Sequence, residues 1–266
     1  MMPLRDAARR AEAFDRYAAW YDAFNQGKDY DAETAYVLRR IQGFAGTPNR
    51  WLDVGCGTGR HLGCLDSKGI DVEGLDSSPA MIAHARLAHP RIPFHVGSAH
   101  DFRLDGDRDV VSLLFHVIDY QVSDGMVRDT LSAIANHLAP AGLLVFDFWN
   151  SDAIERDPPV RRVKEARIDG RPLVRISVPS EGRRRRRVDV RYEFRWDSDQ
   201  GPLEHEELHA VRHFSAAELE VFLQDAGMTV LTCEAWMRNR RLSQNDWYGF
   251  ICAGLEERRA RRSPPV

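Results

Sequence analysis

The chain has 266 residues, of which 43% are apolar and 29% are charged, as expected for one large α/β domain or for such a domain with an insertion. Its net charge of −3 supplies no basic field for nucleic acid. The four cysteines form no C-x-x-C pair and no stretch reaches ~18 apolar residues, so we expect reduced thiols, a cytoplasmic protein and no membrane segment.

The first predicted elements are two helices, over residues 4–24 and about 32–44, which we group as an N-terminal helical lid of residues 1–45. In the first helix, aromatic residues recur at spacings of three and four and share one face: Phe14, Tyr17, Trp20, Tyr21 and Phe24. That face either packs on the core or covers a ligand with its tyrosine hydroxyls turned inward, and periodicity alone favours neither.

A glycine-rich turn follows the first predicted strand. The apolar run 51–54 precedes it, and residues 61–68 have helical composition, so the order is that of a βαβ nucleotide-binding unit. The glycines stand at alternate positions: Gly55, Gly57 and Gly59. Dinucleotide enzymes need a third glycine where this chain has Arg60, so the spacing disfavours a dinucleotide.

An acidic residue precedes the glycines. Asp53 lies at the carboxyl end of its strand, where open α/β sheets bind ligands. A carboxylate there would repel a pyrophosphate but suits a cationic amino group. S-adenosyl-L-methionine has an amino-acid tail and a sulfonium and no phosphate, so this turn favours it as the cofactor.

A second predicted strand, residues 70–76, ends in Asp76, 21 residues after Gly55. That separation is near the ~20 residues at which an acid bonds ribose hydroxyls. Ser78 then suits the N-cap of a helix whose first position is Pro79. The spacing therefore predicts a ribose contact from Asp76.

The two motifs Leu52-Asp-Val-Gly-Cys-Gly-Thr-Gly59 and Gly74-Leu-Asp-Ser-Ser-Pro-Ala-Met81 together resemble the class I S-adenosylmethionine-dependent methyltransferases. In that family the turn after the third strand often reads Gly-Asp and lies near the adenine, whereas this chain has Gly97-Ser98. The resemblance implies S-adenosyl-L-methionine as cofactor, contacted by Tyr17, Asp53, Gly55, Cys56, Gly57, Gly59, Arg60, Leu75, Asp76, Ser77, Met81, Gly97, Ser98, Ala99 and Phe115.

Strands and helices continue to alternate and predict a parallel sheet with helices on both faces, a Rossmann-like α/β core over residues 46–150. The remaining core elements are expected as a third strand within 92–100, a fourth strand at 109–114, a helix at 130–138, a turn at Pro140-Ala-Gly142 and a strand at 143–149. The resemblance places the segment 115–121 beside the methyl group of the cofactor.

The pattern changes after residue 150. Alternating apolar and polar runs with turns, from about 160 to 214, predict antiparallel strands, an inserted sheet assigned to residues 151–214. This sheet would cap the pocket or form a dimer contact. A capping box at 215–218 opens a helix over 216–225. Strands at 228–235 and 247–254 complete the core over 215–257, and a disordered tail is expected at 258–266.

Two motifs in the insertion have competing interpretations. Arginines 183–187 could hold phosphate or nucleic acid, but an exposed strand with alternating arginines is favoured. The sequence His205-Glu-Glu-Leu-His209 has the H-E-x-x-H spacing of zinc proteases, which requires a helix and a third ligand. Here it follows a Gly-Pro turn and continues in alternation, so we expect sheet histidines and no metal site.

Further segments narrow the substrate. The stretches Tyr21-Asp22, Gly27-Lys-Asp-Tyr30 with Glu33, Phe115 to Gln121 and Phe146-Asp-Phe-Trp149 resemble the TDP-amino-sugar N-methyltransferases of deoxysugar biosynthesis and their relatives in surface-polysaccharide gene clusters. The resemblance implies an amino or hydroxyl group of a nucleotide-linked sugar as methyl acceptor. We expect substrate contacts from Tyr30, Trp149, Arg175 and His209.

Methyl transfer to an amine requires a deprotonated, oriented nucleophile. An imidazole (~6.5) is well matched to accept a proton at neutral pH, whereas a phenol (~10) is not. The candidates are His116 and Tyr120, with Tyr21 as a positioning group in the catalytic set. The amino-sugar enzymes carry a histidine where this chain has Tyr120, which leaves the choice of base open.

Three classes of function remain open at this point. The first is a small-molecule methyltransferase, N- or O-directed, and the second is a methyltransferase that acts on RNA or protein. The sequence lacks an Asn/Asp-Pro-Pro-Tyr/Phe/Trp motif, and its charge argues against nucleic acid. The third is a non-catalytic cofactor-binding homologue, which the intact glycine turn and both acids disfavour.

Overall fold

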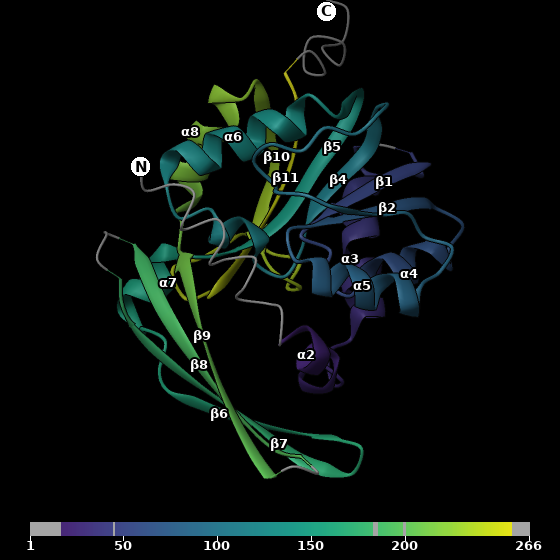
Figure 1. The fold of residues 1–266 in the computed structure, drawn as a ribbon. Coiled ribbons are helices and arrows are strands. Elements are labelled where there is room, and N and C mark those ends of the chain that lie inside the picture. The colour runs from purple at the N-terminus through teal and green to yellow at the C-terminus, as the bar shows by residue number, and fades with distance from the viewer. Residues whose placement is uncertain (1–16, 45, 183–185, 199–200, 257–266) are drawn as a thin grey trace, which may run out of the picture.

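The computed structural model describes residues 17–44, 46–182, 186–198 and 201–256. A seven-stranded sheet forms its centre, in the order β3-β2-β1-β4-β5-β11-β10 (Figure 1). Its strands are β1 (Arg50–Val54), β2 (Asp71–Asp76), β3 (Phe94–Val96), β4 (Arg108–Leu113), β5 (Leu138–Trp149), β10 (Met228–Ala235) and β11 (Tyr248–Leu255). Only the β11 pairings are antiparallel, so the predicted Rossmann-like parallel sheet is confirmed.

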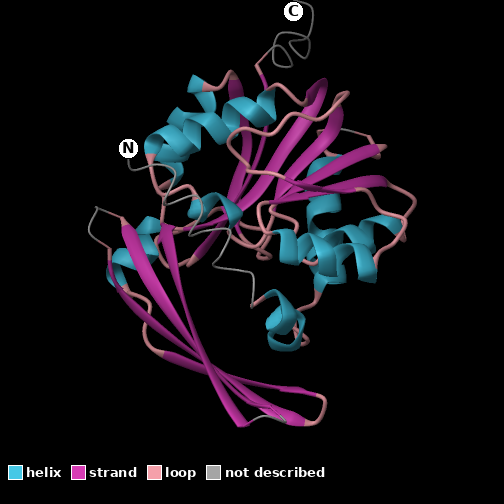
Figure 2. Cartoon of the chain, viewed as in Figure 1, coloured by secondary structure: helices cyan, strands magenta, loops and turns pink. Residues whose placement is uncertain are grey.

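Helices cover both faces of this sheet (Figure 2). Alternation along the strands explains why: Leu52 and Val54 bury against α6 and α8, whereas Trp51 buries against α3, α4 and α5. The helices are α2 (Ala18–Phe24), α3 (Tyr30–Gln42), α4 (Arg60–Asp66), α5 (Pro79–Ala88), α6 (Asp124–Ala135), α7 (Ser151–Arg156) and α8 (Ala216–Asp225), with the 3₁₀ turn η1 (Val117–Tyr120).

The strand order reverses between β1 and β4, because the chain builds one half of the sheet from β1 to β3 and the other from β4 onward. In open α/β sheets, ligands bind outside the carboxyl ends of the strands at such a reversal. The glycine turn after β1 and the segment after β4 both lie at this reversal, and we call the expected ligand site outside these strand ends the crevice.

The inserted segment forms a separate antiparallel sheet in the order β6-β7-β8-β9, which confirms the predicted strands. Its strands are β6 (Arg162–Ile168), β7 (Arg171–Glu181), β8 (Arg187–Ser198) and β9 (Gly201–Arg212). They project as a long curved wing from the main sheet (Figure 1). One face of the wing packs on α2 through a hydrophobic cluster of Tyr17, Trp20, Phe24, Leu173 and Phe194.

The prediction around residues 130–142 was wrong. Helix α6 starts earlier, where Ser123 Oγ accepts the Met126 N–H at 3.3 Å, and it ends at Ala135. The expected turn at Pro140-Ala-Gly142 lies inside β5, where the pairing with β4 shifts register between Arg108 and Val110. Proline is tolerated at such an irregularity because its missing N–H is not needed there.

The boundaries of the other predicted elements differ less from those in the structure. Of the expected helix 4–24, residues 4–16 and Phe14 lie outside the described residues, and so do the tail 258–266 and Arg183–Arg185. Helices α7 and η1 were not predicted. The four cysteines are free thiols. Within the described ranges, the helices are too short or too polar to cross a membrane.

The capping box before α8 yields a stability prediction. Ser215 Oγ accepts the Glu218 N–H at 3.2 Å, and Gly227 closes the turn beyond the helix at φ 72°. Ser215→Ala should lower the free energy of unfolding by about 1 kcal/mol, because it leaves an N-terminal amide without its acceptor. Urea unfolding measures this change. Ser132→Ala, at an exposed interior position of α6, is the matched control, and equal destabilisation by both changes would contradict the capping role.

Candidate active site

The turn after β1 presents bare backbone to the crevice. The N–H groups of Gly55 and Cys56 donate to the Leu75 carbonyl at 2.7 and 3.0 Å, which ties the turn to β2. Gly55, Gly57 and Gly59 have φ of 77°, 54° and 78°, a region that favours glycine. A Cβ on Gly55 would lie 2.6 Å from Val117, whereas one on Gly57 would meet no atom within 4 Å. The backbone at Gly57 therefore borders open space that a ligand can enter.

Asp76 closes the far side of this space at the end of β2. Its Oδ2 accepts the Gly57 N–H at 2.9 Å and its Oδ1 accepts the Ser78 N–H at 2.8 Å. Burial raises the pKa of Asp76, although its backbone hydrogen bonds oppose that effect. The predicted N-cap is also confirmed, since Ser78 Oγ accepts the Met81 N–H at 3.2 Å.

Asp53 lies beneath the turn and is only 2% exposed. Its Oδ1 accepts the Ser112 hydroxyl at 2.6 Å, and Ser112 Oγ accepts the Trp51 indole N–H at 2.8 Å. Burial raises the pKa of Asp53 to about 6, against the opposing charge of His61. The carboxylate thus braces β1 on β4, and its contact with a cofactor amino group stays a prediction.

Residues 21–28 lie against the same crevice. Thr58 Oγ1 donates to Asp22 Oδ1 at 2.8 Å, and the Lys28 ammonium lies 4.0 Å from the centre of the Phe115 ring. Tyr21 meets the same ring edge-on at 6.4 Å. These contacts favour the lid interpretation for this stretch, while Tyr17, Trp20 and Phe24 pack on the wing instead.

Tyr30, at the start of α3, has a hydroxyl that is buried and has no hydrogen-bond partner among the described residues. Its ring lies edge-on to His61 at 4.9 Å and 5.3 Å from the Arg60 guanidinium. Burial and the Asp22 charge raise its pKa, so the phenol is neutral. A neutral buried donor without a partner is what a polar ligand group would satisfy.

His116 is held by Asp147 at the carboxyl end of β5. The Nδ1 atom of His116 lies 2.8 Å from Asp147 Oδ2, and the backbone N–H groups of Phe115 and His116 donate to Oδ1 at 2.7 and 3.2 Å. The imidazole stacks on Tyr248 with ring centres 4.7 Å apart. His116 is therefore fixed on both its edge and its face.

The predicted candidate Tyr120 pairs with His209 rather than with His116. Its hydroxyl lies 3.2 Å from His209 Nδ1, and burial raises its pKa well above the usual range. Burial, with a smaller effect of Arg175, lowers the pKa of His209 to about 3. Both side chains are neutral, so Tyr120 is a poor proton acceptor at neutral pH.

The H-E-x-x-H sequence lies on strand β9, as expected, and not on a helix. Glu207 bridges the two histidines, with Oε1 3.1 Å from His205 Nε2 and Oε2 3.1 Å from His209 Nε2. Glu207 Oε1 also accepts the Tyr17 N–H at 3.2 Å, and Arg175 donates to the Tyr17 hydroxyl. Among the residues described, no three potential ligands are arranged to hold a metal ion.

Trp149 closes the crevice on the side of β5. Its N–H donates to Asp119 Oδ2 at 3.0 Å, and its buried indole nitrogen has no hydrogen-bond partner in the described part of the chain. Its ring lies 6.3 Å from that of His116 and 6.1 Å from that of Trp247. An aromatic wall therefore borders the crevice beside His116.

The other predicted cofactor residues are distributed around the turn. Leu75 and Met81 are buried, and Gly97 N–H donates to the Asp76 carbonyl at 3.0 Å. Ser98 Oγ lies 2.7 Å from His100 Nδ1. Ala99 is half-buried against the core. The exposed backbone of Ser77 precedes the Ser78 cap.

Sequence reasoning missed Asp147, Tyr248 and Glu207 as members of the site. Asp147 had a usable signal, because it interrupts the apolar run of β5 near its carboxyl end just as Asp53 interrupts that of β1. Tyr248 had none, since its place opposite His116 depends on the β11 register, which pairs Tyr248 with Trp149. Glu207 was noticed only as part of a metal motif.

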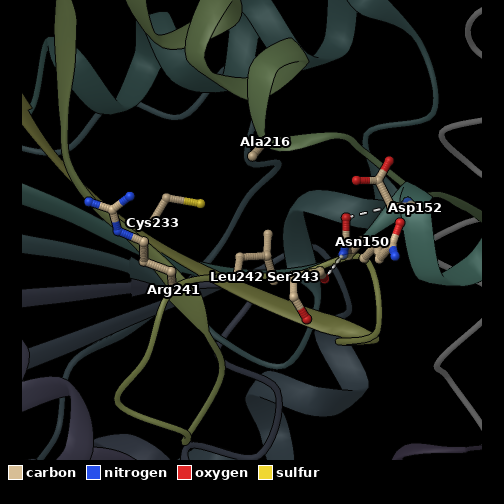
Figure 3. Close-up of a pocket in the computed structure, with 8 residues that line it drawn as sticks. Asn150, Asp152, Ala216, Cys233, Arg241, Leu242 and Ser243 are labelled. Carbon is tan, nitrogen blue, oxygen red and sulfur yellow. Dashed lines mark hydrogen bonds between the residues drawn. The ribbon is translucent and has the colours of Figure 1, made fainter.

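A second hollow, of roughly 380 Å³, lies between the start of α8 and the loop from β10 to β11 (Figure 3). Asn150 fixes that loop by donating to the Ser243 and Asp246 carbonyls at 3.0 and 2.9 Å. The lining residues include none of the predicted site residues: Asn150, Asp152, Ala216, Cys233, Arg241, Leu242, Ser243 and Gln244.

Comparisons with known proteins also indicate a methyltransferase. Residues 21–232 match a family model described as a methyltransferase domain. The chain is 29% identical over 228 residues to a dTDP-3-amino-3,4,6-trideoxy-alpha-D-glucopyranose N,N-dimethyltransferase of Streptomyces venezuelae, covering 85% of this chain and 95% of the relative.

Two solved structures extend the comparison. One is an S-adenosylmethionine-bound amino pentose methyltransferase from Micromonospora echinaspora, with TM-score 0.70, 29% identity and coverage of 90% of this chain and 96% of that chain. The other is a sugar N-methyltransferase from Streptoalloteichus, with TM-score 0.75, 25% identity and coverage of 88% and 91%.

The buried carboxyl of Asp53 predicts a pH effect on stability. Because its pKa rises from 3.8 to about 6 on folding, its contribution is fully present below pH 4 and is lost as pH rises through 6. Asp53→Asn keeps an acceptor for Ser112 but does not titrate. Relative to wild type, this variant should gain on the order of 3 kcal/mol of unfolding free energy between pH 4 and pH 7. Urea unfolding across that range measures the difference, and parallel curves would exclude the effect.

Proposed function

The chain belongs to the methyltransferase domain family, and from this we propose that it transfers a methyl group from S-adenosyl-L-methionine to the amino group of a nucleotide-linked sugar. The observation that carries the proposal is the crevice at the strand-order reversal, where open space over Gly57 lies beside the Asp76 carboxylate. The names of the relative and of the two solved structures support the sugar amine as acceptor.

The residues present suit this cofactor. A Cβ at Gly57 would occupy the open space beside the turn, so bare backbone there can lie against the ligand. The two Asp76 oxygens can accept ribose hydroxyls in place of amide N–H groups. Tyr30, a proposed substrate contact, offers beside this cofactor a neutral hydroxyl that has no partner among the described residues. When bound, S-adenosylmethionine supplies an activated methyl group on its sulfonium sulfur.

The chain's own task is to orient the amine and exclude water. His116 is the proposed proton acceptor, since its Nδ1 is committed to Asp147 and its Nε2 is the remaining nitrogen. Trp149 and Tyr248 border it with apolar ring surface. Tyr21 is proposed to position the substrate from the lid side. Arg175 and His209 remain proposed substrate contacts at the base of the wing.

We also propose that the enzyme is cytoplasmic and forms a homodimer. Four free thiols support a cytoplasmic enzyme. Exposed Val163 and Leu208 on the outer face of the wing support a homodimer through that sheet, which sedimentation velocity can read out. The enzyme is expected to act on small molecules, without nucleic acid as a partner.

The ribose role of Asp76 can be measured directly. Asp76→Ala should weaken S-adenosylhomocysteine binding at least tenfold, because the hydroxyls would lose a charged acceptor worth about 1.5–3 kcal/mol. Isothermal titration calorimetry measures the affinity. Asp71→Ala, at the exposed start of the same strand, is the matched control. Unchanged affinity in Asp76→Ala would remove the residue from the cofactor site.

The reaction itself gives a second expected outcome. Incubation with S-adenosylmethionine and a TDP-linked amino sugar should add one or two methyl groups to the sugar, which mass spectrometry detects. The matching TDP-linked sugar with a hydroxyl in place of the amine is the control and should not react. Methylation of the hydroxyl sugar alone would replace the proposed nitrogen acceptor with oxygen.

A further inference from the structure

We propose that Asp147 is a positioning residue that keeps the proton of neutral His116 on Nδ1 and leaves the Nε2 lone pair for the substrate amine. The inference rests on the proposed function for its chemistry. Its structural part, the tautomer of His116, can be tested without any substrate.

The first observation is the backbone that Asp147 holds. Phe115 and His116 have φ of 68° and 65°, a left-handed conformation that side-chain-bearing residues rarely adopt. Two consecutive residues of this kind are unfavourable unless the surrounding structure holds them. Both of their N–H groups converge on Asp147 Oδ1, at 2.7 and 3.2 Å. This carboxylate oxygen therefore stabilises the strained segment that carries His116 into the crevice.

The second observation concerns Oδ2, the other carboxylate oxygen of Asp147. Asp147 Oδ2 lies 2.8 Å from His116 Nδ1, and the carboxylate is 1% exposed. Burial alone would raise the pKa of Asp147, but His116 and its N–H groups outweigh burial and lower that pKa below its usual range. An ionised carboxylate can only accept, so the proton between the two groups resides on Nδ1.

The third observation is that neighbouring elements leave this arrangement undisturbed. The imidazole face is covered by Tyr248 from β11, at 4.7 Å and an interplanar angle of 19°. Asp119 from η1 is fully buried and accepts the Trp149 N–H instead. Lys28 from the lid acts on Asp147, and Arg162 from β6 acts on Tyr248. The Asp53 carboxyl of β1 also interacts with that of Asp147 and completes this set within the described residues.

The consequence for catalysis follows from which imidazole nitrogen carries the proton. A substrate ammonium group gives one proton to Nε2, which produces an imidazolium that the Asp147 charge stabilises. The amine lone pair that this transfer frees first faces the imidazolium Nε2–H, and rotation about the C–N bond of the sugar turns it toward the methyl carbon. The new C–N bond forms as the C–S bond breaks and its electron pair stays on sulfur. With the proton of neutral His116 on Nε2 instead, that nitrogen would have no lone pair with which to take the proton from the substrate ammonium group.

Asp147→Asn separates the two roles of the carboxylate. The amide oxygen must face the Phe115 and His116 N–H groups, so the NH₂ group faces Nδ1 and forces the proton of neutral His116 onto Nε2. The strained backbone keeps its acceptor. Nitrogen-15 NMR of the purified full chain reads the tautomer, and the His116 signal is assigned by its loss in His116→Gln.

We expect wild-type His116 to be the Nδ1–H tautomer and Asp147→Asn to be the Nε2–H tautomer. The variant should lose at least 100-fold in kcat, while S-adenosylhomocysteine affinity stays within threefold. Asp129→Asn, an exposed change of the same kind on α6, should leave both measurements unchanged. In a His116→Gln background, Asp147→Asn should cost nothing more in kcat, because the imidazole it orients is gone.

The outcomes distinguish this proposal from the proposed function. An Nε2–H tautomer in the wild type would overturn the role of Asp147, whatever the substrate. A further 100-fold loss in the His116→Gln background would also overturn it, because the carboxylate would then act without the imidazole. If NMR gives the expected tautomers but no TDP-linked amino sugar is methylated, the proposed function fails and the positioning of His116 by Asp147 stands.

Discussion

The site depends on left-handed backbone at the carboxyl ends of two neighbouring strands. After β1, glycine adopts this conformation at little cost, and the turn opens its backbone at Gly57. After β4, Phe115 and His116 adopt it with full side chains, and Asp147 Oδ1 accepts the N–H groups of both. Because β1 and β4 are adjacent in the sheet, both bends border the same crevice.

Carboxylates near the strand ends fix the backbone around that crevice; Asp53 and Asp147 are buried and Asp76 is half-buried. Asp53 braces β1 against β4 through Ser112, and Asp76 ties β2 to the glycine turn. Asp147 holds the segment after β4 from the end of β5. Each is desolvated, which is unfavourable for a charge, and each is compensated by N–H or hydroxyl donors. A bound ligand can therefore offer its own hydroxyl or amino group to one of these carboxylates in place of a protein N–H or hydroxyl donor.

The features that could be predicted from the sequence are those that depend on the spacing of neighbouring residues. The glycine turn, the Ser78 and Ser215 caps and the antiparallel wing are all confirmed, since each follows from a few consecutive residues. The start of α6 and the bulged β5 were wrong, because Pro140 is a turn signal in isolation and only pairing with β4 makes it a strand residue. The partnership of Asp147 and Tyr248 with His116 joins three separate strands or loops. A contact between residues this far apart in the sequence leaves no local pattern. The sequence analysis therefore identified His116 but not its contacts with Asp147 and Tyr248.

The most direct test of the account is calorimetric titration of the wild-type chain with S-adenosylmethionine and S-adenosylhomocysteine, repeated with NADH. The glycine spacing, the Asp53 carboxylate and the family assignment all favour a cofactor without a pyrophosphate. The account predicts saturable one-to-one binding of the two sulfur-containing ligands and no heat of binding from NADH. Binding of NADH, or the absence of binding by both sulfur ligands, would contradict it.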